Sequence, residues 1–228
     1  MGIHRVKLYL TLITALLITC ITASCAGRQD SGTVTDDKKI RAAVIDTGFS
    51  EKAIPSGNIA GGKNYVEGSM GTDDTYGHGT AVASIILENA PDTELVALVS
   101  SVYEHGRLKQ VDADTFAGII IDAVDVYGCD VINISAGFAA DVEAVRLAVE
   151  YAAQKGVVVV ASAGNDYVEN PDVKYYPAAY DGVIAVGSMN ESRTAISDFS
   201  QRGEWVDMYE CGENITVRTL SGDSREVS

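Results

Sequence analysis

The sequence predicts an α/β protein: a parallel β-sheet flanked by helices on both faces. Short apolar runs without polar alternation recur along the chain, as expected for strands that are buried on both sides. Segments with apolar residues at helical spacing separate these runs, and strands that alternate with helices indicate a parallel sheet with right-handed crossovers. The chain has 228 residues, of which 46% are apolar, so it is long enough for one domain with a sizeable core.

Each predicted strand is a buried run that stops at a polar or glycine-rich turn. The candidates are residues 41–45, 95–99, 131–134, 157–161 and 183–186. The first of them ends at Asp46, and Gly48 supplies the turn that follows.

Three segments between these strands have helical periodicity. Residues 80–87 place Val82, Ile85 and Ile86 on one face. A second helix is expected to begin at a cap formed by Asp114 and to end at Gly128. Residues 141–155 form the third, which ends at Gly156.

The first 26 residues are predicted to be a leader. Arg5 and Lys7 precede an apolar stretch over residues 8–23, which is typical of a secretory signal. Thr22-Ala23-Ser24-Cys25 also resembles the lipid-attachment box of bacterial lipoproteins, with Cys25 as the modified residue. Cleavage after Ala26 and an uncleaved anchor helix are the alternatives. All three imply export, to the cell envelope as a lipoprotein or as a secreted protein. Residues 27–39 are a polar tether, and residues 40–228 form the folded domain.

The net charge restricts the possible binding partners, and the positions of the cysteines restrict the possible disulfides. The net charge of −15 argues against nucleic acid as a partner and against binding to anionic lipid by charge alone. Outside the leader, Cys129 precedes one strand and Cys211 follows another. In a parallel sheet these thiols lie at opposite edges, too far apart for a disulfide, so we expect both to be free.

Polar side chains gather at the carboxyl ends of the predicted strands, where parallel sheets bind ligands. Asp46, Ser135 and Asn165 each follow directly on a strand. His78 lies between two glycines at the start of a helix, where the helix dipole disfavours the imidazolium form. We therefore expect a neutral ring that acts as a general base, with Asp46 accepting a hydrogen bond from its other nitrogen.

Two further segments suit the binding of a peptide. The amide of Asn165 can donate to an oxyanion, although an Asn in a left-handed turn is the simpler interpretation. Ser135-Ala136-Gly137 ends a strand with small residues, and its open edge can pair with an extended peptide. A tight turn there is the alternative.

Taken together, these segments resemble the successive motifs of the subtilisin-like serine proteases. The similar stretches are Asp46-Thr47-Gly48, Gly77-His78-Gly79-Thr80, residues 130–135 and Ala161-Ser162-Ala163-Gly164-Asn165. The resemblance implies an extended polypeptide as substrate, with Asp46 and His78 as members of a catalytic triad and Asn165 as the oxyanion donor. It also implies a cis peptide bond before Pro177 and no cofactor. The implied walls of the pocket for the residue before the cut are Ser135, Ala136, Gly137, Ala161, Ala163 and Gly164.

The sequence departs from this family at the nucleophile. The Gly-Thr-Ser-x-Ala motif is absent, and Ser221, Ser224 and Ser228 lie in a polar tail that cannot form the buried helix that follows the motif. We therefore expect a C-terminally incomplete peptidase domain, a fragment that does not hydrolyse peptides as it stands. The missing helix should also leave apolar surface exposed.

The same motifs leave two alternative functions open. A non-catalytic exported protein that binds peptides is the main alternative. An aspartic protease, suggested by Asp46-Thr47-Gly48 alone, conflicts with the helical periodicity. The segment over residues 87–91 is short where secreted relatives carry a calcium loop, so no metal is expected there.

Overall fold

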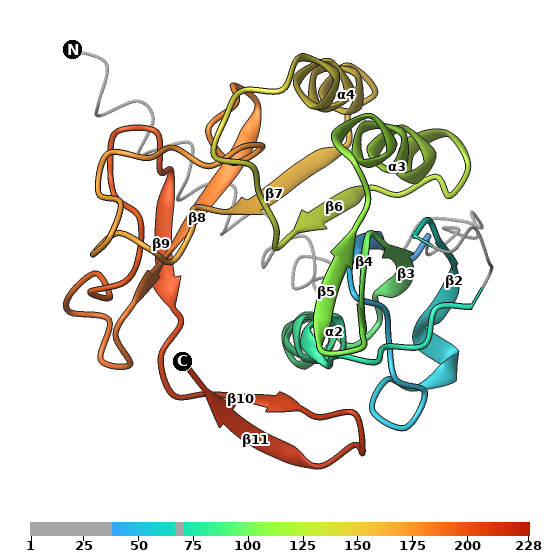
Figure 1. Ribbon diagram of the computed structural model, residues 1–228. Coiled ribbons are helices and arrows are strands. Elements are labelled where there is room, and N and C mark those ends of the chain that lie inside the picture. The colour runs from blue at the N-terminus through green and yellow to red at the C-terminus, as the bar shows by residue number, and fades with distance from the viewer. Residues whose placement is uncertain (1–37, 67–70) are drawn as a thin grey trace, which may run out of the picture. The chain divides into compact units, whose positions relative to one another are not determined.

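The predicted strands lie side by side in one parallel sheet. A computed structural model describes residues 38–66 and 71–228, and within them seven strands pair in the order β2-β3-β1-β6-β7-β8-β9 (Figure 1). All pairings in this sheet are parallel. The strands are β1 (Arg41–Asp46), β2 (Ile59–Asn64), β3 (Glu94–Val99), β6 (Val131–Ile134), β7 (Val158–Ser162), β8 (Val183–Met189) and β9 (Met208–Cys211).

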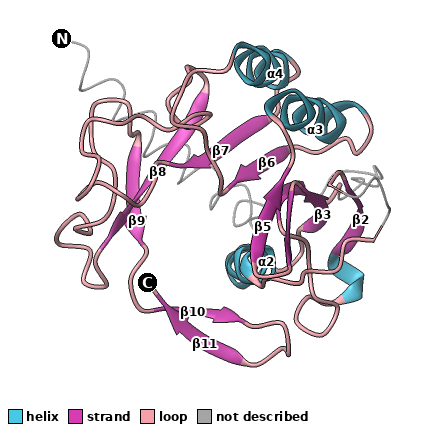
Figure 2. Ribbon diagram, viewed as in Figure 1, coloured by secondary structure: helices cyan, strands magenta, loops and turns pink. Residues whose placement is uncertain are grey.

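Helices cover both faces of this sheet, which confirms the predicted architecture (Figure 2). Helices α3 (Ala113–Asp125) and α4 (Glu143–Gln154) lie on one face, and α2 (His78–Asn89) lies on the other. Ile45 of β1 belongs to the apolar cluster that contains Phe116 of α3. Its neighbour Val44 belongs to the opposite cluster, with Ala83 of α2. Because successive side chains of a strand point to opposite faces, a strand buried on both faces has to be apolar throughout.

The two faces of the sheet are not equally covered at β7 and β8. On the face that carries α3 and α4, Val159, Ala161 and Ala185 are 0–1% exposed. On the opposite face, Val158 is 43% exposed and Ile184 is half-buried. Within the described residues, α2 therefore leaves part of its own side of the sheet open to solvent.

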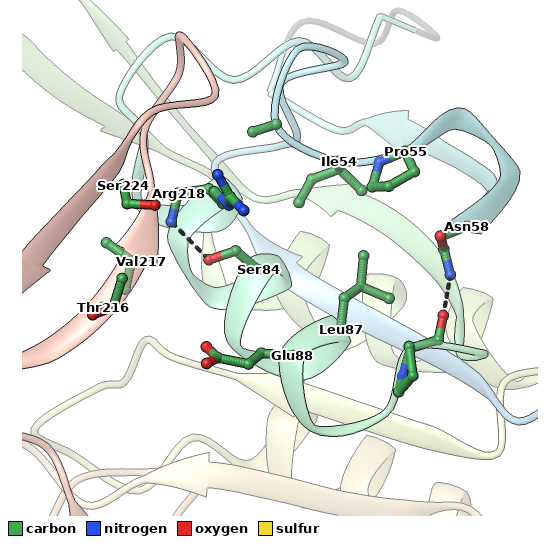
Figure 3. A pocket seen from close by; sticks show the side chains of 12 residues that line it. Ile54, Pro55, Asn58, Ser84, Leu87, Glu88, Thr216, Val217, Arg218 and Ser224 are labelled. Carbon is green, nitrogen blue, oxygen red and sulfur yellow. Dashed lines mark hydrogen bonds between the residues drawn. The ribbon is translucent and has the colours of Figure 1, made fainter.

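Shorter elements lie outside the main sheet. The hairpin of β4 (Ser101–Glu104) and β5 (Arg107–Gln110) follows β3, and the 3-10 turn η2 (Ser56–Asn58) precedes β2. The hairpin of β10 (Ile215–Arg218) and β11 (Ser224–Val227) packs beside α2, where the backbone N–H of Arg218 donates to Ser84 Oγ at 3.0 Å. A pocket of about 400 Å³ lies between this hairpin, α2 and η2 (Figure 3), and none of the predicted site residues lines it.

The structure corrects the predicted start of all three helices, and α4 begins at Glu143, two residues later than predicted. Helix α3 begins at Ala113, and its cap is Asp112, whose side chain accepts from the backbone N–H of Thr115 at 2.8 Å. The prediction that Asp114 caps this helix is wrong, because Asp114 lies inside its first turn. Helix α2 begins at His78, two residues earlier than predicted, after Gly77 in a left-handed conformation.

Two covalent predictions are confirmed among the described residues. Cys129 and Cys211 are free thiols. The peptide bond between Tyr176 and Pro177 is cis.

The predicted leader, with its lipid-attachment Cys25, and most of the predicted tether lie outside the described residues. All helices and strands named above belong to one unit, Lys39–Ser228. Across residues 38–66 and 71–228, no helix combines the length and the apolar character that crossing a membrane requires.

Candidate active site

Asp46 and His78 are in direct contact at the carboxyl edge of the sheet. His78 Nδ1 lies 2.8 Å from both carboxylate oxygens of Asp46. Because a carboxylate only accepts, Nδ1 carries the hydrogen of this bond, and in the neutral ring the lone pair is on Nε2. The Asp46 side chain is 4% exposed and that of His78 is 48% exposed. The pair thus combines a buried acceptor with an imidazole that solvent or a ligand can reach.

A close approach of two backbones brings these residues together. A Cβ on Gly79 would lie 2.4 Å from the carbonyl oxygen of Gly48. The backbone N–H of Gly79 also donates to Thr47 Oγ1 at 2.9 Å. The start of α2 therefore packs directly against the turn after β1, and this contact positions His78 within hydrogen-bonding distance of Asp46.

Asp74 is a buried carboxylate near the site that the sequence did not predict. Its Oδ1 accepts from the backbone N–H groups of Tyr76 and Gly77 at 2.9 and 2.7 Å. Its Oδ2 accepts from the backbone N–H and the hydroxyl of Thr80 at 2.9 and 2.7 Å. Asp74 thus holds the segment that leads into α2 and satisfies donors at the start of this helix. An acidic residue just before a helix start was the available signal.

The pKa of His78 shifts in the opposite direction to the one that the helix dipole predicts. The hydrogen bond to Asp46 raises the pKa of His78 above its ordinary value of 6.5, although burial opposes this rise, and the charges of Asp46 and Asp74 add to it. The helix dipole, which can be anticipated from the sequence, lowers a histidine pKa. A carboxylate in direct contact outweighs that effect.

Replacement of Asp46 by Asn should lower the pKa of His78, because it removes the largest cause of the upward shift. The folded protein holds the His78 proton more tightly than an unfolded chain with a pKa of 6.5. This pairing therefore stabilises the fold fully below about pH 6.5, and the contribution is lost as the pH rises through the raised pKa. A titration of the His78 ring signals by NMR measures the shift.

Asp73→Asn is the matched control for this titration. Asp73 is exposed and is not among the groups that shift the pKa of His78, so its replacement should leave the His78 titration unchanged. An identical His78 pKa in wild type and Asp46→Asn would contradict the assignment of Asp46 as the dominant partner.

The segments after β6 and β7 line a second part of this sheet edge. Because β1, β6 and β7 are adjacent parallel strands, their carboxyl ends lie along the same edge as the Asp46–His78 pair. A pocket of about 360 Å³ lies there, lined by Ser135, Ala136, Gly137, Ser162, Gly164, Asn165, Asp166 and Tyr175.

Two of the predicted pocket residues do not line it. Ala161 and Ala163 are 1% and 0% exposed. Alternate residues of this segment point into the core, which leaves Ser162 and Gly164 to face the pocket. Asp166 and Tyr175 line it as well. Neither residue was predicted to line the pocket. Tyr175 comes from a loop, and the strand pattern does not reveal the position of that loop.

Asn165 is exposed at the mouth of this pocket. Among the described residues its side-chain amide has no hydrogen-bond partner, so its donors are available to a ligand. Across residues 38–66 and 71–228, no group of three or more His, Cys, Asp or Glu side chains is placed to hold a metal ion.

The molecule is thus an α/β protein with an Asp–His pair at the carboxyl edge of its parallel sheet. The family model described as the subtilase family matches residues 37–227, and the chain belongs to this family.

Its relatives include both intracellular and extracellular proteases. The chain is 35% identical over 196 residues to the major intracellular serine protease of Bacillus subtilis (strain 168), a match that covers 78% of this chain and 59% of the relative. It is 35% identical over 188 residues to the minor extracellular protease Epr of the same organism, covering 81% of this chain and 28% of that protein. Subtilisin DY of Bacillus licheniformis is 33% identical over 197 residues, with 81% and 71% covered. The chain thus spans less than two thirds of the first two relatives.

Solved structures show the same fold. A lanthipeptide protease matches with a TM-score of 0.69 at 26% identity, over 81% of this chain and 62% of that one. The prenylagaramide maturation protease PagA matches with a TM-score of 0.68 at 25% identity, over 84% and 69%.

Proposed function

We propose that this chain carries the acid, the base and the oxyanion donor of a subtilisin-like serine endopeptidase. The contact between Asp46 and His78 carries the proposal. Asp46 holds the ring in the tautomer that leaves Nε2 free to take a proton from a serine hydroxyl, and it stabilises the imidazolium that forms. The amide of Asn165 donates to the oxyanion of the tetrahedral intermediate.

The nucleophile of this mechanism is a serine in a Gly-Thr-Ser-x-Ala motif, which these 228 residues do not contain. Ser221, Ser224 and Ser228 are poor candidates because they lie in and around the β10–β11 hairpin, where Ser221 Oγ donates to Asp223 Oδ2 at 2.7 Å. A helix with the motif would suit the open apolar surface on the α2 side of β7 and β8. The proposal therefore requires a serine-bearing segment in addition to the present sequence.

The proposed substrate is an extended polypeptide that lies along residues 135–137. The backbone groups of Ala136 and Gly137 make no hydrogen bond to another described residue, so this edge is open to strand addition. The substrate residue before the cut would then place its side chain in the adjoining pocket.

The proposed location is outside the cytoplasm, with residues 1–26 as a leader, residues 27–39 as a tether and residues 40–228 as the peptidase domain. The apolar leader sequence supports export, and a lipid on Cys25 would tether the protein to a membrane. The strongly negative net charge disfavours nucleic acid as a partner.

A second candidate function is a non-catalytic exported protein that binds peptides. The absence of the nucleophile motif from the 228 residues favours it. The two candidates share the peptide edge and the pocket, and they differ in whether a serine reaches His78 Nε2.

Labelling with a fluorophosphonate probe tests the endopeptidase proposal. We would extend the chain after Ser228 with the Gly-Thr-Ser-x-Ala segment and the following helix of subtilisin DY, and compare it with the 228-residue chain. The extended chain should be labelled at the new serine, whereas the 228-residue chain should not be. A folded extended chain that binds peptide but takes no label would overturn the endopeptidase assignment and favour the binding protein.

A further inference from the structure

One large side chain lies among small ones in the lining of the pocket beside Asn165. Six of the eight residues that line this pocket are Ser, Ala, Gly or Asn, and the other two are Asp166 and Tyr175. Tyr175 is the one aromatic residue in the lining, and it is half-buried. The pocket thus has two walls of small residues, residues 135–137 after β6 and residues 162–165 at the end of β7, and one bulky side chain, that of Tyr175.

Tyr175 touches both of those walls. A Cβ built on Gly164, in the segment after β7, would lie 2.6 Å from Tyr175 Cδ2. A Cβ built on Gly137, in the segment after β6, would lie 3.5 Å from Tyr175 Cβ. Tyr175 therefore spans the space between the two walls, and a ligand side chain that enters between them meets its ring.

A set of hydrogen bonds holds this ring in place. The Tyr175 hydroxyl donates to Asp166 Oδ2. Asp166 also accepts from Asn170 Nδ2 at 2.9 Å and from Gln201 Nε2 at 3.2 Å. Gln201 is fully buried, and its Nε2 donates as well to the carbonyl oxygen of Asn170 at 2.9 Å. The acceptor of the Tyr175 hydroxyl is thus fixed by two other donors, one of them anchored in the core.

The ionisation of the two groups favours the same arrangement near neutral pH. The hydrogen bond between them lowers the pKa of Asp166 and raises the pKa of Tyr175. Asp166 is therefore a carboxylate and Tyr175 a neutral phenol over the physiological range, which is the combination that the hydrogen bond requires.

We propose that Tyr175, held by Asp166, restricts this pocket to small uncharged side chains such as those of Gly, Ala and Ser. This inference rests on the proposed function, because it assigns the pocket to the substrate residue before the cut. A large side chain meets the Tyr175 ring between the walls, and an acidic side chain meets the carboxylate of Asp166.

Peptide binding to the 228-residue chain tests this inference without any need for catalysis. Fluorescence anisotropy would measure the affinity of labelled, N-acylated tetrapeptides that differ only in a C-terminal Ala, Phe or Glu. Wild type should bind the Ala peptide about tenfold more tightly than the Phe peptide, a difference typical of pockets that discriminate by size. In Tyr175→Ala this preference should disappear or reverse, while the Glu peptide stays the weakest ligand.

Two variants separate the role of the ring from general effects of a lost tyrosine. Tyr175→Phe keeps the ring but loses its bond to Asp166, and it should raise the affinity for the Phe peptide on the order of threefold. It serves as the test if Tyr175→Ala does not fold. Tyr151→Ala is the matched control, because the Tyr151 hydroxyl also donates to a carboxylate, that of Asp125, but does so on the α3–α4 side of the sheet. It should leave the preference for Ala unchanged.

The outcomes distinguish this inference from the function on which it rests. Equal affinity of wild type for the Ala and Phe peptides, with binding that Gly137→Val abolishes, would overturn the size restriction and leave the peptide edge supported. An unchanged preference in folded Tyr175→Ala would also overturn it. A complete lack of peptide binding by wild type and by the variants would overturn the proposed peptide site, and the inference with it.

Discussion

Replacement of His78 by Ala is expected to lower kcat about 10⁶-fold in the chain extended with a serine-bearing helix, which is the loss known for the corresponding change in subtilisin itself. His78 Nε2 is the base in the proposed mechanism, and its other nitrogen is already committed to Asp46 at 2.8 Å. Without the imidazole the serine hydroxyl has no proton acceptor. Hydrolysis of a fluorogenic peptide under saturating conditions measures the effect.

Replacement of Asp46 or Asn165 should lower kcat less than replacement of His78 does, and the effect of Asp46 should be the larger of the two. Asp46→Asn should cost about 10⁴-fold in kcat, because the ring then loses the acceptor that fixes its tautomer. Asn165→Ala should cost about 10²- to 10³-fold, as expected for one oxyanion donor. These losses should not add up when the replacements are combined, since the groups act on the same step.

His105→Asn is the control for these measurements. His105 lies in the turn of the β4–β5 hairpin with a positive φ of 50°, and Asn tolerates that backbone conformation. Its replacement should leave kcat unchanged. If His78→Ala kept more than about 1% of the activity of the extended chain, a loss smaller than that of any single triad member, His78 would not be the base.

The fold was predictable because strands buried on both faces impose a strong pattern on the sequence. Residues 42–45 are all apolar and belong alternately to the two clusters on either side of the sheet, and Asp46 follows them where the strand ends. The same pattern places Asp46, Ser135 and Asn165 at strand ends, so the edge that carries the site could be located without coordinates.

The parts that sequence reasoning missed depend on contacts between distant segments. The pKa of His78 is set by a carboxylate 32 residues away, whereas the helix dipole is a local feature that can be anticipated from the sequence. Tyr175 reaches the pocket from a loop and is fixed there by Asp166, and no periodicity reports such a contact. The cap of α3 was misplaced for a simpler reason, because Asp112 and Asp114 are both good caps and only the backbone decides between them.

Gly79→Ala is expected to destabilise the protein by about 3 kcal/mol or more, at the upper end of the cost of overpacking. The added methyl group would lie 2.4 Å from the carbonyl oxygen of Gly48 and 2.9 Å from its nitrogen. Backbone atoms cannot move aside as a flexible side chain can, so α2 has to shift away from the turn after β1. Thermal unfolding followed by circular dichroism should show a Tm lower by about 6–12 °C.

Gly118→Ala is the matched replacement, since Gly118 also lies in a helix, α3, and a Cβ there meets no atom within 4 Å. It should stabilise the protein by about 0.5–1 kcal/mol, because Ala loses less conformational freedom on folding than Gly does. The two replacements add the same methyl group to the same kind of element, so helix propensity cannot account for opposite signs.

The displacement of α2 also has a consequence at the active site. His78 precedes Gly79 and moves with it, so its contact with Asp46 should lengthen and its pKa should fall towards the ordinary value of 6.5. Gly118→Ala should leave the His78 titration as it is in wild type. If Gly79→Ala lost stability but kept the wild-type pKa of His78, the contact between Gly79 and Gly48 would support the fold without positioning the Asp46–His78 pair.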